Sequence, residues 1–171
     1  MADLRVRLTG PADIAAIASL RAQWTGAAAD GEFEGRVRDW LAAEGDRRLV
    51  WLASVDREPA GLASLLEYHR MPRPDRLVSR WGYVGNMFVR EDLRNRGIGS
   101  ALLQAIIAES DARGYARVVL SPTERAVPFY ARAGFVDADA AVGNDRMMVR
   151  VAASQPAGAP ANSSSLPSGS R

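Results

Sequence analysis

The segment from Val89 to Leu103 reads VREDLRNRGIGSALL and contains three arginines and two glycines. It follows an apolar stretch, Trp81 to Val89, that has the composition of a strand, and it leads into a run whose apolar residues recur at helical spacing. Glycine disfavours a helix, yet Gly97 and Gly99 stand where this helix should begin. The turn between the strand and the helix must therefore need glycine for a reason other than helix stability.

The start of this predicted helix has the chemistry of an anion-binding site. Its first backbone N–H groups have no partners within the helix and carry partial positive charge. Glycine at positions 97 and 99 lets an anion approach these groups closely, and Arg94 and Arg96 add full charge and paired donors. The combination predicts binding of a diphosphate in preference to a single carboxylate. The simpler alternative is that the glycines only shape the turn and the arginines are solvated.

Two common phosphate-binding motifs do not fit this segment. A dinucleotide-binding fingerprint requires a third glycine where Leu102 stands, and an acidic residue at the end of a strand about twenty residues further on. A P-loop requires Gly-Lys-Ser/Thr, and the chain contains no lysine. The segment therefore predicts a different kind of phosphate-binding turn.

The composition narrows the class of protein. The chain has 171 residues, of which 47% are hydrophobic and 25% charged, as is typical of one globular domain. It has no cysteine and one histidine, so neither a thiolate nucleophile nor a zinc site is predicted. A net charge of +2 does not indicate nucleic-acid binding, and no apolar run has the length of a membrane span. We expect a cytoplasmic protein without metal, nucleic-acid or membrane partners.

The apolar pattern predicts alternating strands and helices. Strands are expected at residues 4–8, 49–55, 60–68, 81–89, 117–120, 135–138 and 146–151, and helices at 11–24, 33–41, 98–113 and 125–133. Pro59 is expected to limit pairing at the turn between the second and third strands. Residues 81–89 are almost wholly apolar, which favours a central strand. The order is that of an α+β domain, residues 1–152, built on one mixed sheet.

The last residues of the chain differ from this domain in composition. Residues 153–171 are rich in Ala, Ser, Pro and Gly. Such a segment cannot bury enough apolar surface to fold, so a disordered tail is predicted.

Two stretches of the chain resemble one known family. Residues 94–99, Arg-Asn-Arg-Gly-Ile-Gly, resemble the Q/R-x-x-G-x-G/A acetyl-coenzyme A signature of the GNAT family of N-acetyltransferases. Residues 123–135, TERAVPFYARAGF, are similar to the family's N-x-x-A-x-x-x-Y-x-x-x-G-F, with Thr123 in place of the asparagine. The resemblance covers roughly residues 3–151 and implies a mostly antiparallel mixed sheet with helices on both faces.

The resemblance also implies a binding site for acetyl-coenzyme A (acetyl-CoA). In the family, free backbone groups of the strand before the signature hold the pantetheine arm and polarise the thioester carbonyl. Gly85 and Asn86 are expected to form a bulge that separates this strand from the next, although Gly85 could merely relieve crowding. The implied cofactor-binding residues are Met87, Phe88, Val89, Arg94, Asn95, Arg96, Gly97, Ile98, Gly99, Ser100, Thr123 and Tyr130.

Two residues are candidates for the proton transfers. Tyr130 matches the family's general acid, which protonates the departing thiolate, and a phenol with a pKa near 10 keeps its proton at neutral pH. The family's base is commonly a glutamate on the strand before the signature, but residues 81–89 contain no carboxylate. Glu67 on the neighbouring strand is the substitute that we predict, with His69 on the same face.

The resemblance places the acceptor between the early helices and the loop before the central strand. The candidate acceptor-binding residues are Trp24, Glu32, Phe33, Tyr68 and Asn86. Glu32 would suit a cationic amine, but acidic residues also stabilise the start of a helix. The arginines at 70, 73, 76 and 80 could instead favour a carboxylate-bearing acceptor such as an amino acid.

Together these features predict an acetyl-CoA-dependent N-acetyltransferase. The primary amine of a small molecule or peptide would attack the thioester directly in a ternary complex, without a metal. A homodimer is one option for the assembly, because many members of the family dimerise. The alternatives are a non-catalytic acetyl-CoA-binding module and an acyltransferase that uses another acyl-CoA.

Overall fold

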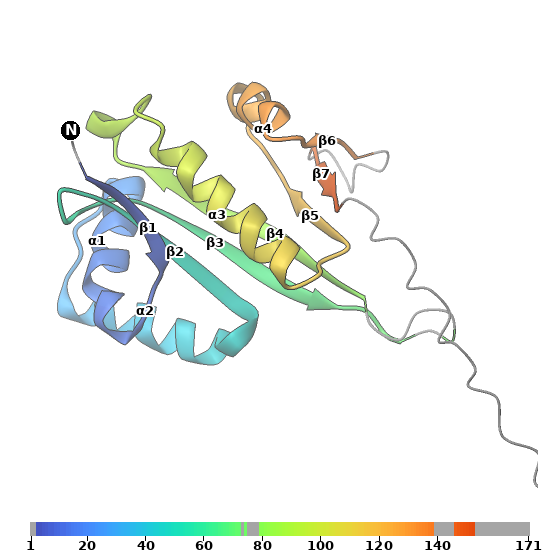
Figure 1. Cartoon of the computed structure of the whole chain (residues 1–171). Coiled ribbons are helices and arrows are strands. Elements are labelled where there is room, and N and C mark those ends of the chain that lie inside the picture. The colour runs from blue at the N-terminus through green and yellow to red at the C-terminus, as the bar shows by residue number, and fades with distance from the viewer. Residues whose placement is uncertain (1–2, 73, 75–78, 139–145, 153–171) are drawn as a thin grey trace, which may run out of the picture.

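The computed structural model describes residues 3–72, 74, 79–138 and 146–152. Within these ranges, seven strands form one sheet in the order β1-β2-β3-β4-β5-β7-β6 (Figure 1). The strands are β1 (Leu4–Leu8), β2 (Arg48–Val55), β3 (Glu58–His69), β4 (Arg80–Val89), β5 (Arg117–Leu120), β6 (Val136–Asp137) and β7 (Met148–Val151). Of the six strand pairs, only β4 and β5 run parallel. The mostly antiparallel α+β fold is confirmed, with β4 at its centre. The predicted tail, residues 153–171, lies outside the described residues.

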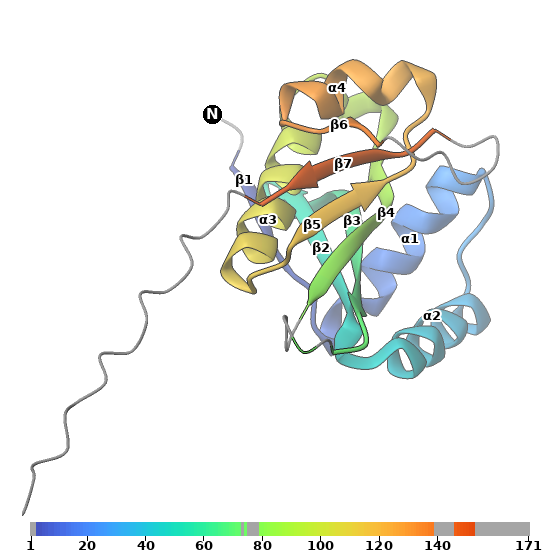
Figure 2. The same cartoon turned by 90° about the vertical axis from the view of Figure 1, so that its right-hand side faces the viewer.

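Helices cover both faces of this sheet. The helices α1 (Ile14–Thr25) and α2 (Gly31–Glu44) lie on one face, and α3 (Ile98–Ala112) lies on the other (Figure 2). The short helix α4 (Val127–Arg132) follows β5 and packs with the residues around α3. None of the helices in the described part of the chain is long and apolar enough to cross a bilayer.

Each face has its own hydrophobic core. Leu65 of β3 and Leu102 and Ile106 of α3 belong to the larger core and are almost fully buried. Leu20 of α1, with Leu62 and Phe88 from the sheet, belongs to the smaller core on the opposite face. The apolar positions of α3 repeat at intervals of three and four, so one side of that helix is buried along its whole length.

The turn between β2 and β3 is tighter than the sequence predicts. Asp56 and Arg57 have φ angles of +49° and +72°, the left-handed pair typical of a two-residue hairpin turn. β3 therefore begins at Glu58 and includes Pro59, which we expected to lie in the turn. Proline has no N–H group to donate, and the register of the two strands shifts beside it, between Ala53 and Ser54.

A bulge in the middle of β4 opens the sheet. Leu62 pairs with Phe88 and Ser64 pairs with Gly85, so three residue steps of β4 face two of β3. Asn86 lies in this bulge with a φ of +53°, which confirms the bulge predicted at Gly85 and Asn86. On its other side β4 pairs with β5 only at Gly82 and Tyr83. The second half of β4 therefore has backbone groups that β5 does not use.

Candidate active site

The start of α3 presents a row of unpaired backbone N–H groups. Asn95 and Gly97 have φ angles of +62° and +81°, and this left-handed pair turns the chain into the helix. The N–H of Ala101 makes the first helical hydrogen bond, to the oxygen of Gly97 at 2.9 Å. The N–H groups of residues 95–100 have no acceptor among the described residues. This is the backbone geometry that the sequence predicts for an anion-binding turn.

The two glycines of this turn have different structural reasons. Gly97 needs its left-handed φ, which side chains other than glycine and asparagine rarely adopt. Gly99 has no such φ, and an added Cβ there would meet Phe129 and Val89 only at 3.6–3.8 Å, an ordinary van der Waals distance. Neither backbone strain nor crowding explains Gly99. A glycine here leaves the neighbouring N–H groups uncovered by a side chain.

A cavity lies beside this turn, and its lining residues come from both stretches that resemble the family signatures. Its volume is about 320 Å³, and it is lined by Arg94, Thr123, Arg125 and Ala126. Arg94 makes a long hydrogen bond from Nε to the oxygen of Val89 at 3.4 Å, and a 3.6 Å ion pair with Glu91. Arg125 is a cation that the sequence interpretation did not single out, although it lies only two residues after Thr123.

The Tyr130 side chain is buried among aromatic rings. It contacts Phe129 and Phe135 edge to face, with ring centroids 4.9 and 5.9 Å apart. Burial raises the pKa of its hydroxyl, and Tyr83 of β4 adds to the rise. That hydroxyl makes no hydrogen bond to a described residue, and no buried side-chain oxygen there lacks a partner. Tyr130 keeps 8% of its surface exposed to solvent.

Glu67 does not reach the acceptor side of the sheet. It shares a strand face with Ala63 and Leu65, which belong to the core under α3. Its carboxylate accepts hydrogen bonds from Tyr115 and from Nε2 of His69. The sequence interpretation made Glu67 the base, and this role stays a prediction; the structure places Glu67 on the face that α3 covers, with both carboxylate oxygens hydrogen-bonded.

Cations and donors hold this carboxylate ionised. Arg113 and Arg80 lie 3.7 and 3.9 Å from its oxygens. Burial alone would raise the pKa of Glu67, but the hydrogen bonds from Tyr115 and His69 and the charge of Arg80 outweigh it and lower the pKa. Burial, together with the hydrogen bond to Glu67, raises the pKa of the Tyr115 hydroxyl. The group ties the end of α3 to β3, which is a structural role.

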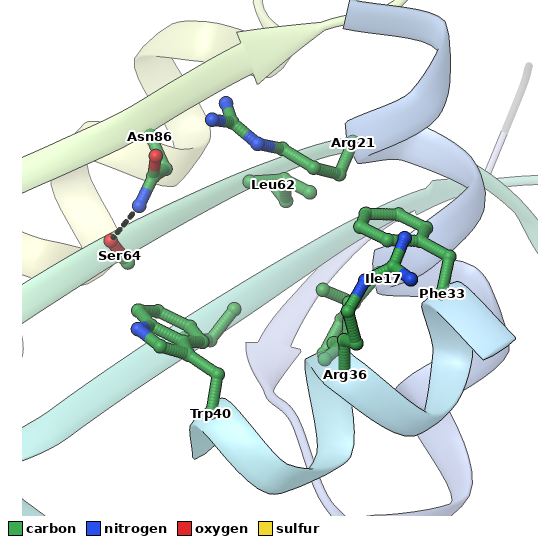
Figure 3. A pocket seen from close by; sticks show the side chains of 10 residues that line it. Ile17, Arg21, Phe33, Arg36, Trp40, Leu62, Ser64 and Asn86 are labelled. Carbon is green, nitrogen blue, oxygen red and sulfur yellow. Dashed lines mark hydrogen bonds between the residues drawn. The ribbon is translucent and has the colours of Figure 1, made fainter. Parts of the chain in front are cut away.

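Another cavity lies on the opposite face, between the sheet and the first two helices (Figure 3). Its volume is about 330 Å³, near the lower end of the range for small-molecule sites. The lining residues are Ile17, Arg21, Phe33, Arg36, Val37, Trp40, Val50, Leu62, Ser64 and Asn86. Because Asn86 belongs to the bulge of β4, the cavity reaches the opened part of the sheet.

Two of the five predicted acceptor-binding residues line this cavity, namely Phe33 and Asn86. The other three lie outside its lining. Trp24 stacks on Phe88 with centroids 5.6 Å apart, and Tyr68 stacks on Trp81 at 4.3 Å. Glu32 forms an ion pair at 2.6 Å with Arg36, which itself lines the cavity.

Sequence reasoning missed Arg21, Arg36 and Ser64. Arg21 follows Ile17 by four residues and so continues the buried face of α1, a spacing that could have revealed it. Ser64 holds Asn86 in place, since Nδ2 of Asn86 donates to Oγ of Ser64 at 3.1 Å. The Ser64 hydroxyl in turn donates to the backbone oxygen of Gly85, also at 3.1 Å. The cavity thus holds two arginines and no carboxylate in its lining.

Comparison with known proteins identifies the family. Residues 14–135 match the sequence model of the acetyltransferase (GNAT) family. The chain belongs to this family. The match spans both the anion-binding turn and the stretch around Tyr130, so the resemblance of these two segments is confirmed.

Two curated relatives of this GNAT chain carry the same name. The chain is 32% identical over 75 residues to a glucosamine 6-phosphate N-acetyltransferase of Trypanosoma brucei brucei, covering 44% of this chain and 49% of that protein. It is 30% identical over 106 residues to glucosamine 6-phosphate N-acetyltransferase 1 of Oryza sativa subsp. japonica, covering 60% of this chain and 62% of that protein. The chain therefore spans less than two thirds of either relative.

The same fold occurs in solved structures of GNAT proteins. One is a predicted acetyltransferase from Clostridium acetobutylicum, solved with acetyl-CoA. It superposes with a TM-score of 0.67 at 19% identity, covering 82% of this chain and 94% of the other.

Proposed function

We propose that this GNAT-family chain is an N-acetyltransferase that uses acetyl-CoA as its acetyl donor and acts on a primary amine. The observation that carries the proposal is the row of six free N–H groups at residues 95–100, flanked by Arg94 and Arg96. Such a row fits a diphosphate, which a coenzyme A thioester carries and a simple thioester lacks. Family membership supports the same donor.

In this proposal the donor lies along the opened side of β4. The turn at residues 95–100 binds the diphosphate, and Arg125 supplies further positive charge beside Thr123. The backbone of Met87, Phe88 and Val89 holds the pantetheine arm, because β5 leaves that part of β4 unpaired. An N–H of this segment donates to the thioester carbonyl oxygen, where negative charge develops during the reaction.

The reaction itself is a direct acyl transfer. The nitrogen lone pair of the neutral amine attacks the thioester carbon, a C–N bond forms, and the C–S bond breaks. The Tyr130 hydroxyl gives its proton to the departing sulfur and is reprotonated from solvent. The products are the N-acetyl amide, coenzyme A as its thiol, and one proton that the incoming ammonium releases. A raised pKa of Tyr130 suits this role, because the phenol keeps its proton until sulfur gains charge.

The amine loses its proton to solvent water in this scheme. Among the described residues that line the acceptor cavity there is no carboxylate or histidine. Solvent therefore replaces the side-chain base of the original interpretation, and the rate should rise with pH as the free amine becomes more abundant.

The acceptor carries an anionic group besides its amine. Two arginines and no carboxylate line the cavity, which disfavours a polycationic acceptor and favours an anion. The names of the two curated relatives point to an acceptor of this kind, an amino sugar that carries a phosphate.

The proposal is tested by measuring thiol release from acetyl-CoA with a panel of primary amines. We expect at least one anionic amine to release coenzyme A and to gain an acetyl group detectable by mass spectrometry. Binding of acetyl-CoA without turnover of any amine would favour a non-catalytic module. Faster turnover with propionyl-CoA or a longer acyl-CoA would assign the chain to a different acyl donor.

A further inference from the structure

The acceptor cavity is polar at one end and apolar over the rest of its wall. Six of its lining residues are apolar: Ile17, Phe33, Val37, Trp40, Val50 and Leu62. Four are polar: Arg21, Arg36, Ser64 and Asn86. Most of the wall therefore offers no hydrogen bond to a ligand.

Arg21 is the cation available to a ligand in this cavity. It extends from α1 across the cavity toward Asn86 (Figure 3). It stacks over the ring of Trp24, with its guanidinium carbon 4.5 Å from the ring centroid, and within the described residues no carboxylate pairs with it. Arg36, in contrast, is already paired with Glu32 at 2.6 Å. An anion in this cavity is thus bound by Arg21 first, close to β4.

Asn86 offers an acceptor at the same end. Its Nδ2 is held by Ser64 at 3.1 Å, which fixes the orientation of the amide. Its Oδ1 points away from Ser64 and makes no hydrogen bond to a described residue (Figure 3). Asn86 lines the cavity at the bulge of β4, so this oxygen lies where the cavity meets the opened part of the sheet. It can accept a hydrogen bond from the amine.

We propose that the acceptor is a free α-amino acid with a large apolar side chain; this inference rests on the proposed function. An α-amino acid carries its amine and its carboxylate on one carbon, as the nearness of Asn86 and Arg21 requires. Arg21 binds the carboxylate, Oδ1 of Asn86 binds the amine, and the side chain packs on Val37, Trp40 and Val50. This occupant satisfies both the polar end and the apolar wall.

The same wall disfavours the acceptor named for the curated relatives. An amino sugar carries a hydroxyl on nearly every carbon, and hydroxyls against an apolar wall lose their hydrogen bonds to water without replacement. A polyamine fails for the opposite reason, because the described lining contains no carboxylate to pair with a second ammonium. In this proposal the acceptor of the chain differs from the one for which these relatives are named.

The test compares acceptors that differ in one feature at a time. Phenylalanine, phenethylamine, glycine and glucosamine 6-phosphate are assayed by thiol release with acetyl-CoA. We expect kcat/KM for phenylalanine to exceed that for phenethylamine by about 10- to 100-fold, the usual value of hydrogen bonds to a charged group. Glycine, which lacks the apolar side chain, should be at least about tenfold poorer than phenylalanine.

An Arg21→Gln variant assigns the preference to one residue. It should remove the advantage of phenylalanine over phenethylamine, a relative loss of about 10- to 100-fold in kcat/KM for phenylalanine. Arg38→Gln, an equal change of charge on an exposed part of α2, is the matched control and should change neither value. Retained acetyl-CoA binding by both variants shows that they are folded.

The outcomes separate this inference from the proposed function. Three results would overturn the proposal of an amino-acid acceptor and leave the acetyltransferase activity standing. They are equal rates with phenylalanine and phenethylamine, a preference for glucosamine 6-phosphate, and an equal loss of both rates in Arg21→Gln. Failure of every acceptor to release thiol, with acetyl-CoA bound, would instead overturn the proposed function itself.

Discussion

Replacing Glu67 by glutamine separates a structural carboxylate from a catalytic one. The variant removes a charge that two arginines face at 3.7 and 3.9 Å and that accepts hydrogen bonds from Tyr115 and His69. At an effective dielectric constant near 20, each arginine at such a distance attracts the carboxylate by about 4 kcal/mol before the cost of desolvation is subtracted. Desolvation offsets most of this, and the net loss is about 2 kcal/mol of unfolding free energy.

The assay pairs urea unfolding with steady-state kinetics. Glu67→Gln should unfold at a lower urea concentration, while kcat/KM at 25 °C stays within about threefold of the parent value. A general base contributes about 10²- to 10⁴-fold to the rate, so the two roles are easily distinguished. Glu58→Gln, an exposed position on the same strand, is the control and should change stability by less than about 0.5 kcal/mol. A hundredfold fall in kcat with unchanged stability would refute the structural role.

The pH dependence of stability gives a second readout. The pKa of Glu67 is lower in the folded state than its usual value, so the folded state binds its proton less readily than the unfolded chain does. The contribution of Glu67 is therefore present above its unfolded pKa and is lost as the pH falls through its folded pKa. The difference between the parent protein and Glu67→Gln should shrink across that acidic range.

Two further predictions concern the general acid and the start of α1. Tyr130→Phe should lower kcat by about 100-fold without changing the dissociation constant for acetyl-CoA, as measured by stopped-flow thiol release and calorimetry. Because burial raises the pKa of Tyr130, the rate of the parent enzyme should not fall as the pH is raised toward about 10, which a pH profile checks. Asp13→Asn removes paired bonds of 2.7 and 2.8 Å to Arg7, which lower the pKa of Asp13 to about 2. It should cost about 1–2 kcal/mol at pH 7 and nothing near pH 2, as measured by denaturation at both pH values; a pH-independent loss would contradict this pairing.

The sequence predicts most of the fold because its local signals agree with one another. The apolar periodicity of α3 matches the face of that helix that the structure buries, whereas β1, at the edge of the sheet, buries only Val6 in part. The asparagine at position 86 marks the bulge, because asparagine adopts the left-handed φ there more easily than most residues do. Pro59 misled the interpretation, because a proline can lie in a strand next to a bulge, as Pro59 does opposite Ser54.

The candidate site was less predictable, because it depends on the face of the sheet toward which each side chain points. The spacing on β3 puts Glu67 on the face of Ala63 and Leu65, and Ser64 on the other, yet the sequence does not say which face holds the acceptor. Arg21 belongs to the site only because α1 packs across the sheet near the bulge, a contact between distant parts of the chain. The arginines expected at positions 73 and 76 lie outside the described residues.

Binding of acetyl-CoA to a Gly99→Asp variant tests the central claim most directly. A carboxylate at this turn would face the diphosphate at about 5 Å and repel it by roughly 3 kcal/mol, or about a hundredfold in the dissociation constant measured by calorimetry. Gly35→Asp on α2, where an added Cβ meets nothing within 4 Å, introduces the same charge and should leave the affinity unchanged. A folded Gly99→Asp protein that binds acetyl-CoA as tightly as the parent would contradict the assignment of residues 95–100 as the diphosphate site.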